Sequence, residues 1–219
     1  HGTDGLGGVG IPLALPSFLE QVPDDYLHRT IRVGRPGRVM PPFYKLSADE
    51  INAIIGHIRS WSKKPAPAWD ASPIKGNKTR GRILFNSHCS SCHGKEGKGG
   101  KGTGVMFSRP KDLPITAPSL NNQGFLNSAS DQMIKHIIMH GRKETPMPSG
   151  LALGLNENQI DDIVSYLRSF EKSKILIKPA AIDEEPASLV YESSYSFEET
   201  VENVKRSIAG MNFVHIRDQ

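Results

Sequence analysis

Apolar residues recur at the 3.6-residue period of an α-helix in several short stretches of the chain. The pattern predicts a helix over residues 130–140, with Ser130 as its N-cap and Gly141 as its stop. Asn156 is placed to cap a further helix, whose apolar residues are Ile160, Ile163, Val164 and Leu167. A shorter helix is expected over residues 77–87, which carries Gly81, Leu84 and Phe85. Three short helices joined by glycine- and proline-rich loops leave a crevice between them.

The same order of residues occurs twice in the chain. One constant shift along the sequence places Asp24, Gly34, Arg35, Met40 and Pro41 on Asp131, Gly141, Arg142, Met147 and Pro148. With a short insertion, the apolar positions from Leu46 to Trp61 fall on those from Leu155 to Phe170. Because glycines, apolar positions and a Met-Pro pair match in one order, we interpret the chain as two copies of one domain. The first copy spans residues 1–62 and the second spans residues 74–172.

Two linkers and a C-terminal part complete the predicted organisation. Residues 63–73 form a short, stiff linker with polyproline character. Residues 173–187 form a second linker, and residues 188–219 the start of a small α+β domain. The β-α-β pattern there consists of a strand at 188–194, a helix from Phe197 to Ile208 that ends at Gly210, and a strand beginning at 213–216. The expected fold is therefore mainly α, with a partial α+β segment at the end.

Composition limits the kind of core that these domains form. Apolar residues make up only 37% of the 219 residues and aromatic residues 7%, so each domain has a thin protein core. A large apolar cofactor would supply much of the buried surface in such a domain. No apolar run approaches the length that spans a membrane, and no targeting peptide stands at the start. We therefore expect no membrane anchor within this sequence.

The strongest chemical signal is Cys89-Ser90-Ser91-Cys92-His93, because C-x-x-C-H is the attachment pattern of a c-type haem. Two thiols on one helical turn can each add to a haem vinyl group, and the adjoining His93 then reaches the iron. A structural zinc site needs further ligands at suitable spacing, and the chain has no other cysteine. A redox dithiol is expected between a strand and a helix, whereas Gly, Lys and Ser surround this pair. We therefore expect haem c attached to Cys89 and Cys92.

Residues 72–172 resemble a class I c-type cytochrome domain. The features that carry the resemblance are Gly81, Phe85, the motif from Cys89 to His93, Gly94, the Met147-Pro148 pair and the closing helix that ends near Tyr166. The resemblance implies that His93 is the proximal iron ligand and Met147 the distal one. A thioether is a soft, neutral ligand that favours reduced iron and raises the haem potential. Covalent haem attachment is completed outside the cytoplasm in bacteria, which implies a periplasmic or equivalent location.

Other residues compete with Met147 for the distal position. Met106, Met133 and Met139 also lie downstream of the motif, but a methionine in a helix usually fills the core. Pro146 and Pro148 place Met147 in an extended loop, and Met40 repeats it in the first copy. The competing histidines are His136 and His140, the second of which is replaced by Val33 in the first copy. We expect the remaining histidines at the surface: His28, His57, His88 and His215.

The first copy raises the question of a second haem. It carries Met40 at the ligand position, but it has no attachment cysteines and no first helix. Because His1-Gly2 repeats His93-Gly94, we expect a missing N-terminal stretch that ends in another C-x-x-C, with His1 and Met40 as the ligands of a second haem. Without its first helix, the copy would expose Ile51, Ile55 and Ile58. The alternative is a relic domain that keeps the fold and has lost the haem.

A basic, glycine-rich loop runs from Gly94 to Pro118 and carries Lys95, Lys98, Lys101, Arg109 and Lys111. Nucleic-acid binding is not favoured, because no aromatic residues are interleaved as stacking platforms. A phosphate-binding loop is not favoured either, because the required motif follows no strand. The loop is either a solvated insert or a surface that steers an acidic redox partner, in line with the net charge of +4.

The C-terminal part, residues 188–219, resembles the opening of the domain of unknown function 302 family, with loose motifs, and we expect that domain to continue past the sequence. Taken together, the sequence predicts a periplasmic dihaem cytochrome that passes single electrons between redox proteins. One rival is a haem subunit of an oxidoreductase acting on a small sulfur or nitrogen compound, which needs an exchangeable iron ligand. A second rival is a haem sensor, which needs a ligand swap at Met147.

Overall fold

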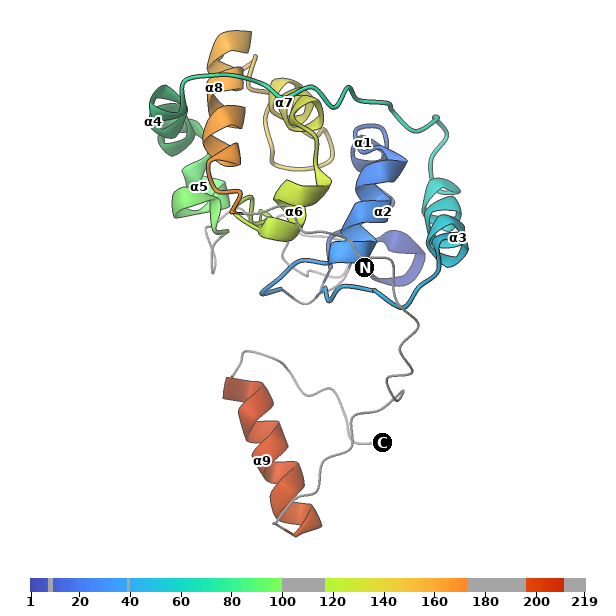
Figure 1. The fold of residues 1–219 in the computed structure, drawn as a ribbon. Coiled ribbons are helices and arrows are strands. Elements are labelled where there is room, and N and C mark those ends of the chain that lie inside the picture. Colours follow the sequence, from blue (N-terminus) through green and yellow to red (C-terminus); the bar gives the residue numbers. More distant parts are fainter. Residues whose placement is uncertain (8–9, 39, 100–116, 173–195, 211–219) are drawn as a thin grey trace. The chain divides into compact units, whose positions relative to one another are not determined.

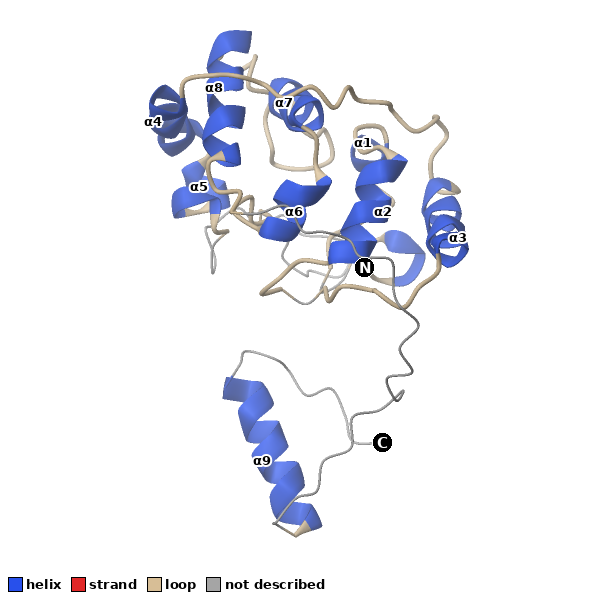
Figure 2. Cartoon of the chain, viewed as in Figure 1, coloured by secondary structure: helices blue, strands red, loops and turns tan. Residues whose placement is uncertain are grey.

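A computed structural model describes residues 1–7, 10–38, 40–99, 117–172 and 196–210, and over these ranges the chain forms helices and no strands (Figure 2). The mainly α fold class is therefore confirmed. The chain divides into two compact units, His1–Ala181 and Ile182–Gln219, which are described separately. None of the helices in the described ranges is long and apolar enough to cross a membrane.

The motif and the closing helix belong to a cluster of helices in the second half of the first unit (Figure 1). Its elements are α4 (Lys78–His88), α5 (Ser90–His93), η2 (Lys95–Gly97), α6 (Gln123–Ser128), α7 (Asp131–His140) and α8 (Glu157–Arg168). The side chains of Asn77, Asn122, Ser130 and Asn156 accept hydrogen bonds from backbone N–H groups of the first turn of α4, α6, α7 and α8. The three predicted helices are present, and α4 begins one residue later than expected because Asn77 is its cap.

Helix α4 lies against α8, and Gly81 sets how closely they approach. A Cβ atom added at Gly81 would lie 2.5 Å from the carbonyl carbon of Asp162 and 3.0 Å from the Cβ atom of Tyr166. The fully buried ring of Phe85 packs beside Tyr166, with ring centroids 5.5 Å apart. Burial alone would raise the pKa of Asp162, but hydrogen bonds from Arg80 and the Asn77 N–H lower it. This packing fixes α4, whose last turn leads into the motif.

The first half of the unit repeats three of these helices. It contains η1 (Thr3–Gly5), α1 (Pro16–Leu19), α2 (Asp24–Val33) and α3 (Ala48–Arg59). Helices α2 and α7 begin at the matching residues Asp24 and Asp131, and each has 10 residues. Helices α3 and α8 each have 12 residues. Both closing helices begin with a capping box, formed by Ser47 with Glu50 and by Asn156 with Gln159.

One arginine anchors the closing helix in each half. The Arg59 guanidinium donates to the carboxylate of Asp24 and to the carbonyl oxygens of Leu19 and Val22, at 2.6–2.7 Å. Arg168 makes the corresponding bonds to Asp131, Leu126 and Ala129 in the second half. Each guanidinium thereby ties the end of its closing helix to the turn between two earlier helices, with charge-assisted hydrogen bonds.

The expected exposure of Ile51, Ile55 and Ile58 is wrong, because their exposed fractions are only 0%, 6% and 6%. These residues share one face of α3 and pack in the same core as α1 and α2. The rest of the α3 surface is exposed: Ile54 is 38% exposed, and a Cβ atom added at Gly56 would meet nothing within 4 Å. On α8 the matching residues are Ile163, which is fully buried, and Ser165, which is also buried. On both closing helices, the side that packs in the core is therefore distinct from the side that a first helix would cover.

The second unit contributes helix α9 (Phe197–Gly210), which agrees with the predicted helix between Phe197 and Gly210. Ser196 begins the helix with reciprocal bonds to Glu199: the Glu199 N–H donates to Ser196 Oγ, and the Ser196 N–H donates to the Glu199 carboxylate, each at 3.2 Å. The strands predicted at 188–194 and 213–216, and the linker at 173–187, lie outside the described residues.

Candidate haem site

The attachment motif lies where α4 ends and α5 begins. Cys89 is the residue between the two helices: its N–H donates to the carbonyl oxygen of Phe85 at 2.8 Å, and its own carbonyl accepts from the N–H of His93 at 2.9 Å. The N–H of Cys92 also donates to the Cys89 carbonyl, at 3.2 Å. The short turn therefore holds both cysteines and the histidine in one helical segment, and both cysteines are partly buried and form no disulfide.

The environment of Cys89 disfavours the redox and zinc alternatives. Burial, and then the neighbouring Cys92, raise the pKa of the Cys89 thiol to about 11. A nucleophilic or metal-binding cysteine needs a lowered pKa, because the thiolate is the reactive and ligating form. Across the residues that the structure describes, no group of three or more His, Cys, Asp or Glu side chains could hold a metal ion.

His93 is oriented by a single backbone carbonyl. Its side chain is buried, and Nδ1 lies 2.9 Å from the carbonyl oxygen of Pro118. A carbonyl oxygen can only accept, so Nδ1 carries the proton and Nε2 keeps its lone pair. Burial lowers the pKa of His93, which keeps the ring neutral. The arrangement fits an iron ligand, because a ligating histidine usually donates its other N–H to a fixed acceptor.

Met147 lies in a loop that closes on its own backbone. Gly141 ends α7 with a φ of 67°, where a Cβ atom would lie 2.6 Å from the Met147 carbonyl oxygen, so the turn requires glycine. The Arg142 N–H donates to that same carbonyl at 3.1 Å, and the Met147 N–H donates to Thr145 Oγ1 at 3.2 Å. The competing Met133 is fully buried in the core instead.

The competing histidines of α7 belong to a different contact. The ring of His136 stacks on Trp69 of the 63–73 linker and on His140, each with ring centroids 4.4 Å apart. Burial, and then His140, lower the pKa of His136. His140, His57 and His88 are exposed and His28 is half-buried, while His215 lies outside the described residues.

The hydrogen bonds around His1 repeat those around His93, although His1 is exposed and His93 is buried. Nδ1 of His1 lies 2.8 Å from the carbonyl oxygen of Ile11, the residue that matches Pro118 in the repeat. The Gly7 N–H donates to the His1 carbonyl at 2.6 Å, as the Gly99 N–H donates to the His93 carbonyl at 2.7 Å. The glycines that follow the two histidines have φ values of 78° and 75°. The backbone turn and the ring orientation are therefore the same at both histidines.

The surroundings of Met40 repeat those of Met147 in the same way. Gly34 ends α2 with a φ of 61°, and a Cβ atom there would lie 2.6 Å from the Met40 carbonyl oxygen. The Arg35 N–H donates to that carbonyl at 2.8 Å. Met40 and Met147 are both partly buried. Each half of the unit thus contains a histidine turn and a methionine loop, and both have the same backbone hydrogen bonds in the two halves.

Sequence reasoning missed the two carbonyls that orient the histidines. Ile11 and Pro118 carry no functional side chain, so residue type gave no signal. Their separation in the chain, which equals the separation between Met40 and Met147, was the only signal available. Trp69 was likewise treated as part of a linker, whereas it stacks on His136 and donates from Nε1 to the Gln21 carbonyl at 2.8 Å.

Comparisons with known proteins find a family match in the second half of the first unit. Residues 79–171 match the family model described as cytochrome c. A curated relative is the cbb3-type cytochrome c oxidase subunit CcoP of Azospirillum sp. (strain B510), 25% identical over 156 residues, which cover 65% of this chain and 48% of the relative. The chain thus spans about half the length of that relative.

A solved structure with a similar outline is a chain of the reducing HAO-like protein complex of Kuenenia stuttgartiensis. The TM-score is 0.49 at 23% sequence identity, and the match covers 70% of this chain and 77% of that one. The match of residues 79–171 to the cytochrome c family model supports electron transport as the function of this part of the chain and covalently bound haem c as its cofactor.

Proposed function

We propose that this protein transfers single electrons between redox partners outside the cytoplasm, through haem c attached to Cys89 and Cys92 and ligated by His93 and Met147. The carrying observation is the buried His93 ring, whose Nδ1–H is committed to the Pro118 carbonyl so that Nε2 can bind iron. When bound, haem c supplies an iron centre that gains and loses one electron.

The residues around the site suit a carrier. The Met147 loop is short and internally hydrogen-bonded, so it can hold a thioether at a fixed place. His93 and Met147 would together supply the two protein ligands of the haem iron, and a soft thioether ligand would raise the reduction potential. A filled coordination sphere leaves no open position for a substrate, which separates a carrier from the rival oxidoreductase.

The ligation is tested with cyanide and carbon monoxide on the natural, haem-loaded protein. A carrier with Met147 bound shows a nearly unchanged spectrum after brief exposure, whereas an open-site enzyme shows an immediate shift. Met147→Ala should convert the first behaviour into the second. Rapid binding by the unsubstituted protein would refute methionine ligation and favour the enzyme.

The proposal includes a second haem in the first half, with His1 and Met40 as its ligands. The support is the repeated geometry: the same Nδ1 contact to a carbonyl, the same positive-φ glycines and the same loop closure. A domain that had lost its haem would not be expected to keep the Nδ1 contact of His1 and the loop closure at Met40. The required attachment cysteines would come from a stretch that precedes His1.

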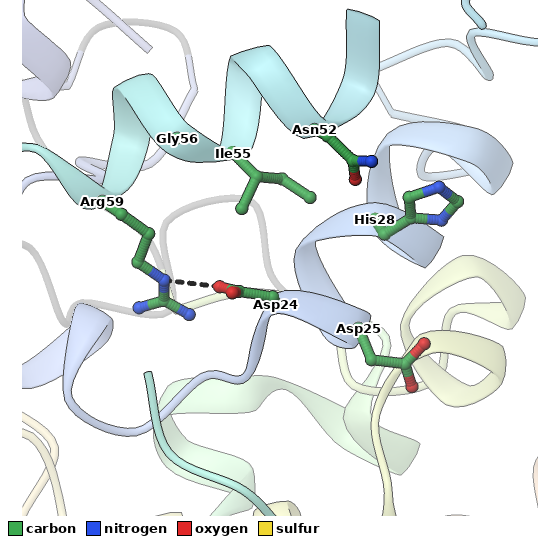
Figure 3. A pocket seen from close by; sticks show the side chains of 7 residues that line it. All are labelled: Asp24, Asp25, His28, Asn52, Ile55, Gly56 and Arg59. Atoms are coloured by element: carbon green, nitrogen blue, oxygen red, sulfur yellow. Dashed lines mark hydrogen bonds and ion pairs between the residues drawn. The ribbon is translucent and has the colours of Figure 1, made fainter. Parts of the chain in front are cut away.

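The uncovered face of α3 also supports such a preceding stretch. An open groove between α2 and α3 is lined by Asp24, Asp25, His28, Asn52, Ile55, Gly56 and Arg59 (Figure 3). In the matching place on α7 and α8, the backbone of Ile74, just before α4, donates to Asp131 and accepts from Ser165. Asp131 corresponds to Asp24, so the groove keeps the acceptor that seats the entry to a first helix, while Gly56 stands in place of the donor Ser165.

The haem count is tested by the denatured mass of the natural protein together with its haem content. Two covalent haems on a chain with a C-x-x-C before His1 would support the dihaem proposal. One haem per chain would reduce residues 1–62 to a haemless domain and overturn it, without affecting the assignment of the second half.

The partners are proposed to be redox proteins, and the chain to work as an electron-transfer subunit. The similarity to an oxidase subunit favours a place in a larger redox complex, with a haem subunit of an oxidoreductase as the second candidate. The net charge of +4 and Lys95 and Lys98 near the motif would favour an acidic docking surface. An acidic partner predicts electron-transfer rates that fall as ionic strength rises.

A further inference from the structure

The two halves of the first unit contact each other through their methionine loops. Helix α1 of the first half meets the segment Gly141–Glu144, which opens the Met147 loop. Helix α6 of the second half meets the segment Gly34–Arg38, which opens the Met40 loop. We call these contacts the crossed loops, because each loop starts against the other half.

Gln21 makes the central bond to the Met147 loop. Its Nε2 donates to the carbonyl oxygen of Gly141 at 2.7 Å, and the side chain is buried. Gly141 is the residue at which the chain leaves α7 for the loop, so this bond fixes the direction of departure. A buried carbonyl without this donor would lose a hydrogen bond that water cannot easily replace.

Two further contacts hold the same segment. The N–H of Ser17 donates to the Glu144 carboxylate at 3.1 Å. The Arg142 guanidinium lies over the ring of Phe18, with Cζ 5.1 Å from the ring centroid. Three residues of the first half, Ser17, Phe18 and Gln21, therefore meet the opening segment of the Met147 loop.

The contacts in the opposite direction involve the corresponding segments. Asn122 Nδ2 donates to the carbonyl oxygen of Pro36 at 2.8 Å. A Cβ atom added at Gly124 would lie 3.1 Å from the carbonyl carbon of Gly34 and 3.0 Å from Cδ of Pro36. Arg38 donates to the carbonyl oxygen of Lys98, just after the motif, at 2.7 Å. The two halves thus hold each other's loops reciprocally.

We infer that Gln21 is a positioning residue for Met147, so that the first half sets the strength of the methionine ligand in the second half. The inference rests on the proposed ligation by Met147, but not on a second haem. A loop held at Gly141 presents its thioether at a fixed place, whereas a loosened loop opens more often and lets external ligands compete. If the Met147 loop were held only by contacts within the second half, the first half would not affect how firmly Met147 is held.

The test replaces Gln21 in the full, haem-loaded protein with methionine, which matches its length and lacks the donor. Gln21 Oε1 is buried and has no hydrogen-bond partner within the described residues, so the cost of the substitution comes from the lost bond to the Gly141 carbonyl. The readouts are the rate of cyanide binding to the oxidised protein and the absorption band of thioether-to-ferric-iron charge transfer. Loss of one hydrogen bond that holds the loop should speed cyanide binding about tenfold and weaken the band.

Gln123→Met is the matched control. Gln123 lies in α6 and makes one bond of the same kind, from Nε2 to the Phe170 carbonyl at 2.8 Å, and it also accepts from the Lys172 N–H at Oε1 at 3.0 Å. Neither bond touches the Met147 loop. The control should leave the cyanide rate and the band unchanged at equal or greater loss of stability.

A second variant, Glu144→Ala, covers the case in which Gln21→Met fails to fold. Glu144 is exposed, so its loss leaves the core intact while removing the bond to the Ser17 N–H. Faster cyanide binding in Gln21→Met, or in Glu144→Ala where Gln21→Met does not fold, supports the inference if the control is unchanged. Rates equal to those of the unsubstituted protein, or an equal rise in the control, would overturn it. If the unsubstituted protein itself lacks the charge-transfer band, the proposed methionine ligation fails instead.

Discussion

Replacing Gly81 with alanine tests whether the approach of α4 to α8 holds the haem motif in place. An added Cβ atom would lie 2.5 Å from the Asp162 carbonyl carbon and 3.0 Å from the Tyr166 Cβ atom. Favourable carbon–carbon contacts lie at about 3.5–4.0 Å, so the two helices must separate by roughly 1 Å. The obstacle is backbone, which cannot rotate away as a flexible side chain could.

The cost follows from the contacts that this separation strains. Overpacking costs about 1–3 kcal/mol, and the rigid neighbour places Gly81→Ala at the upper end. The bonds from the Asn77 N–H to Asp162 and from Ser165 to the Ile74 carbonyl would each lose about 1 kcal/mol if they broke. Alanine regains about 1 kcal/mol of helix propensity. The net loss should therefore be about 2 kcal/mol if both bonds survive and about 4 kcal/mol if both break.

The assay is chemical denaturation of the haem-loaded protein, followed by the Soret absorption and by helical circular dichroism. Gly56→Ala is the control, because Gly56 lies in α3 with nothing within 4 Å of an added Cβ atom. Alanine there should stabilise the protein by about 0.5–1 kcal/mol. If Gly81→Ala were as stable as Gly56→Ala, the tight crossing of α4 and α8 would not be what holds the motif.

Three further predictions concern charge and attachment. Stability conferred by Asp162 is present above the ordinary pKa of a carboxyl group and is lost as pH falls through its lowered folded value, so Asp162→Asn should flatten the acid limb of a stability–pH curve. Arg168→Gln leaves the buried Asp131 carboxylate without its cation and should cost about 3–5 kcal/mol by urea denaturation. Cys89→Ser should leave one thioether, seen as a haem spectrum with one unreacted vinyl group and a lower holoprotein yield.

Local patterns in the sequence were sufficient to predict the helices whose N-cap and stop residues lie next to them in the chain. The stretch from Ser130 to Gly141 carries a cap, an apolar face and a stop, and α7 spans Asp131–His140 as these signals require. The internal repeat also placed Met40 and Met147 in matching loops, because the loop is encoded by neighbouring glycine and proline residues. Such features depend on contacts between residues close in sequence.

The faces of α3 were read incorrectly for a physical reason. Apolar residues at Ile51, Ile55 and Ile58 indicate a buried face, but periodicity does not say which neighbour buries it. In the structure these residues pack in one core with residues of α1 and α2, while the rest of the α3 surface, with Ile54 and Gly56, is exposed. Only packing distinguishes two adjacent faces of one helix.

The sequence by itself was enough to predict covalent haem attachment at Cys89 and Cys92, since these residues and His93 are adjacent and need only one helical turn to act together. It also determined the two methionine loops, through residues that are near each other in the chain. The tertiary structure alone decided that the Ile11 and Pro118 carbonyls orient His1 and His93, and that Gln21 holds Gly141. These partners are backbone atoms, or side chains far away in the sequence, and a backbone carbonyl has the same chemistry at every position. Its role is set by where the fold places it.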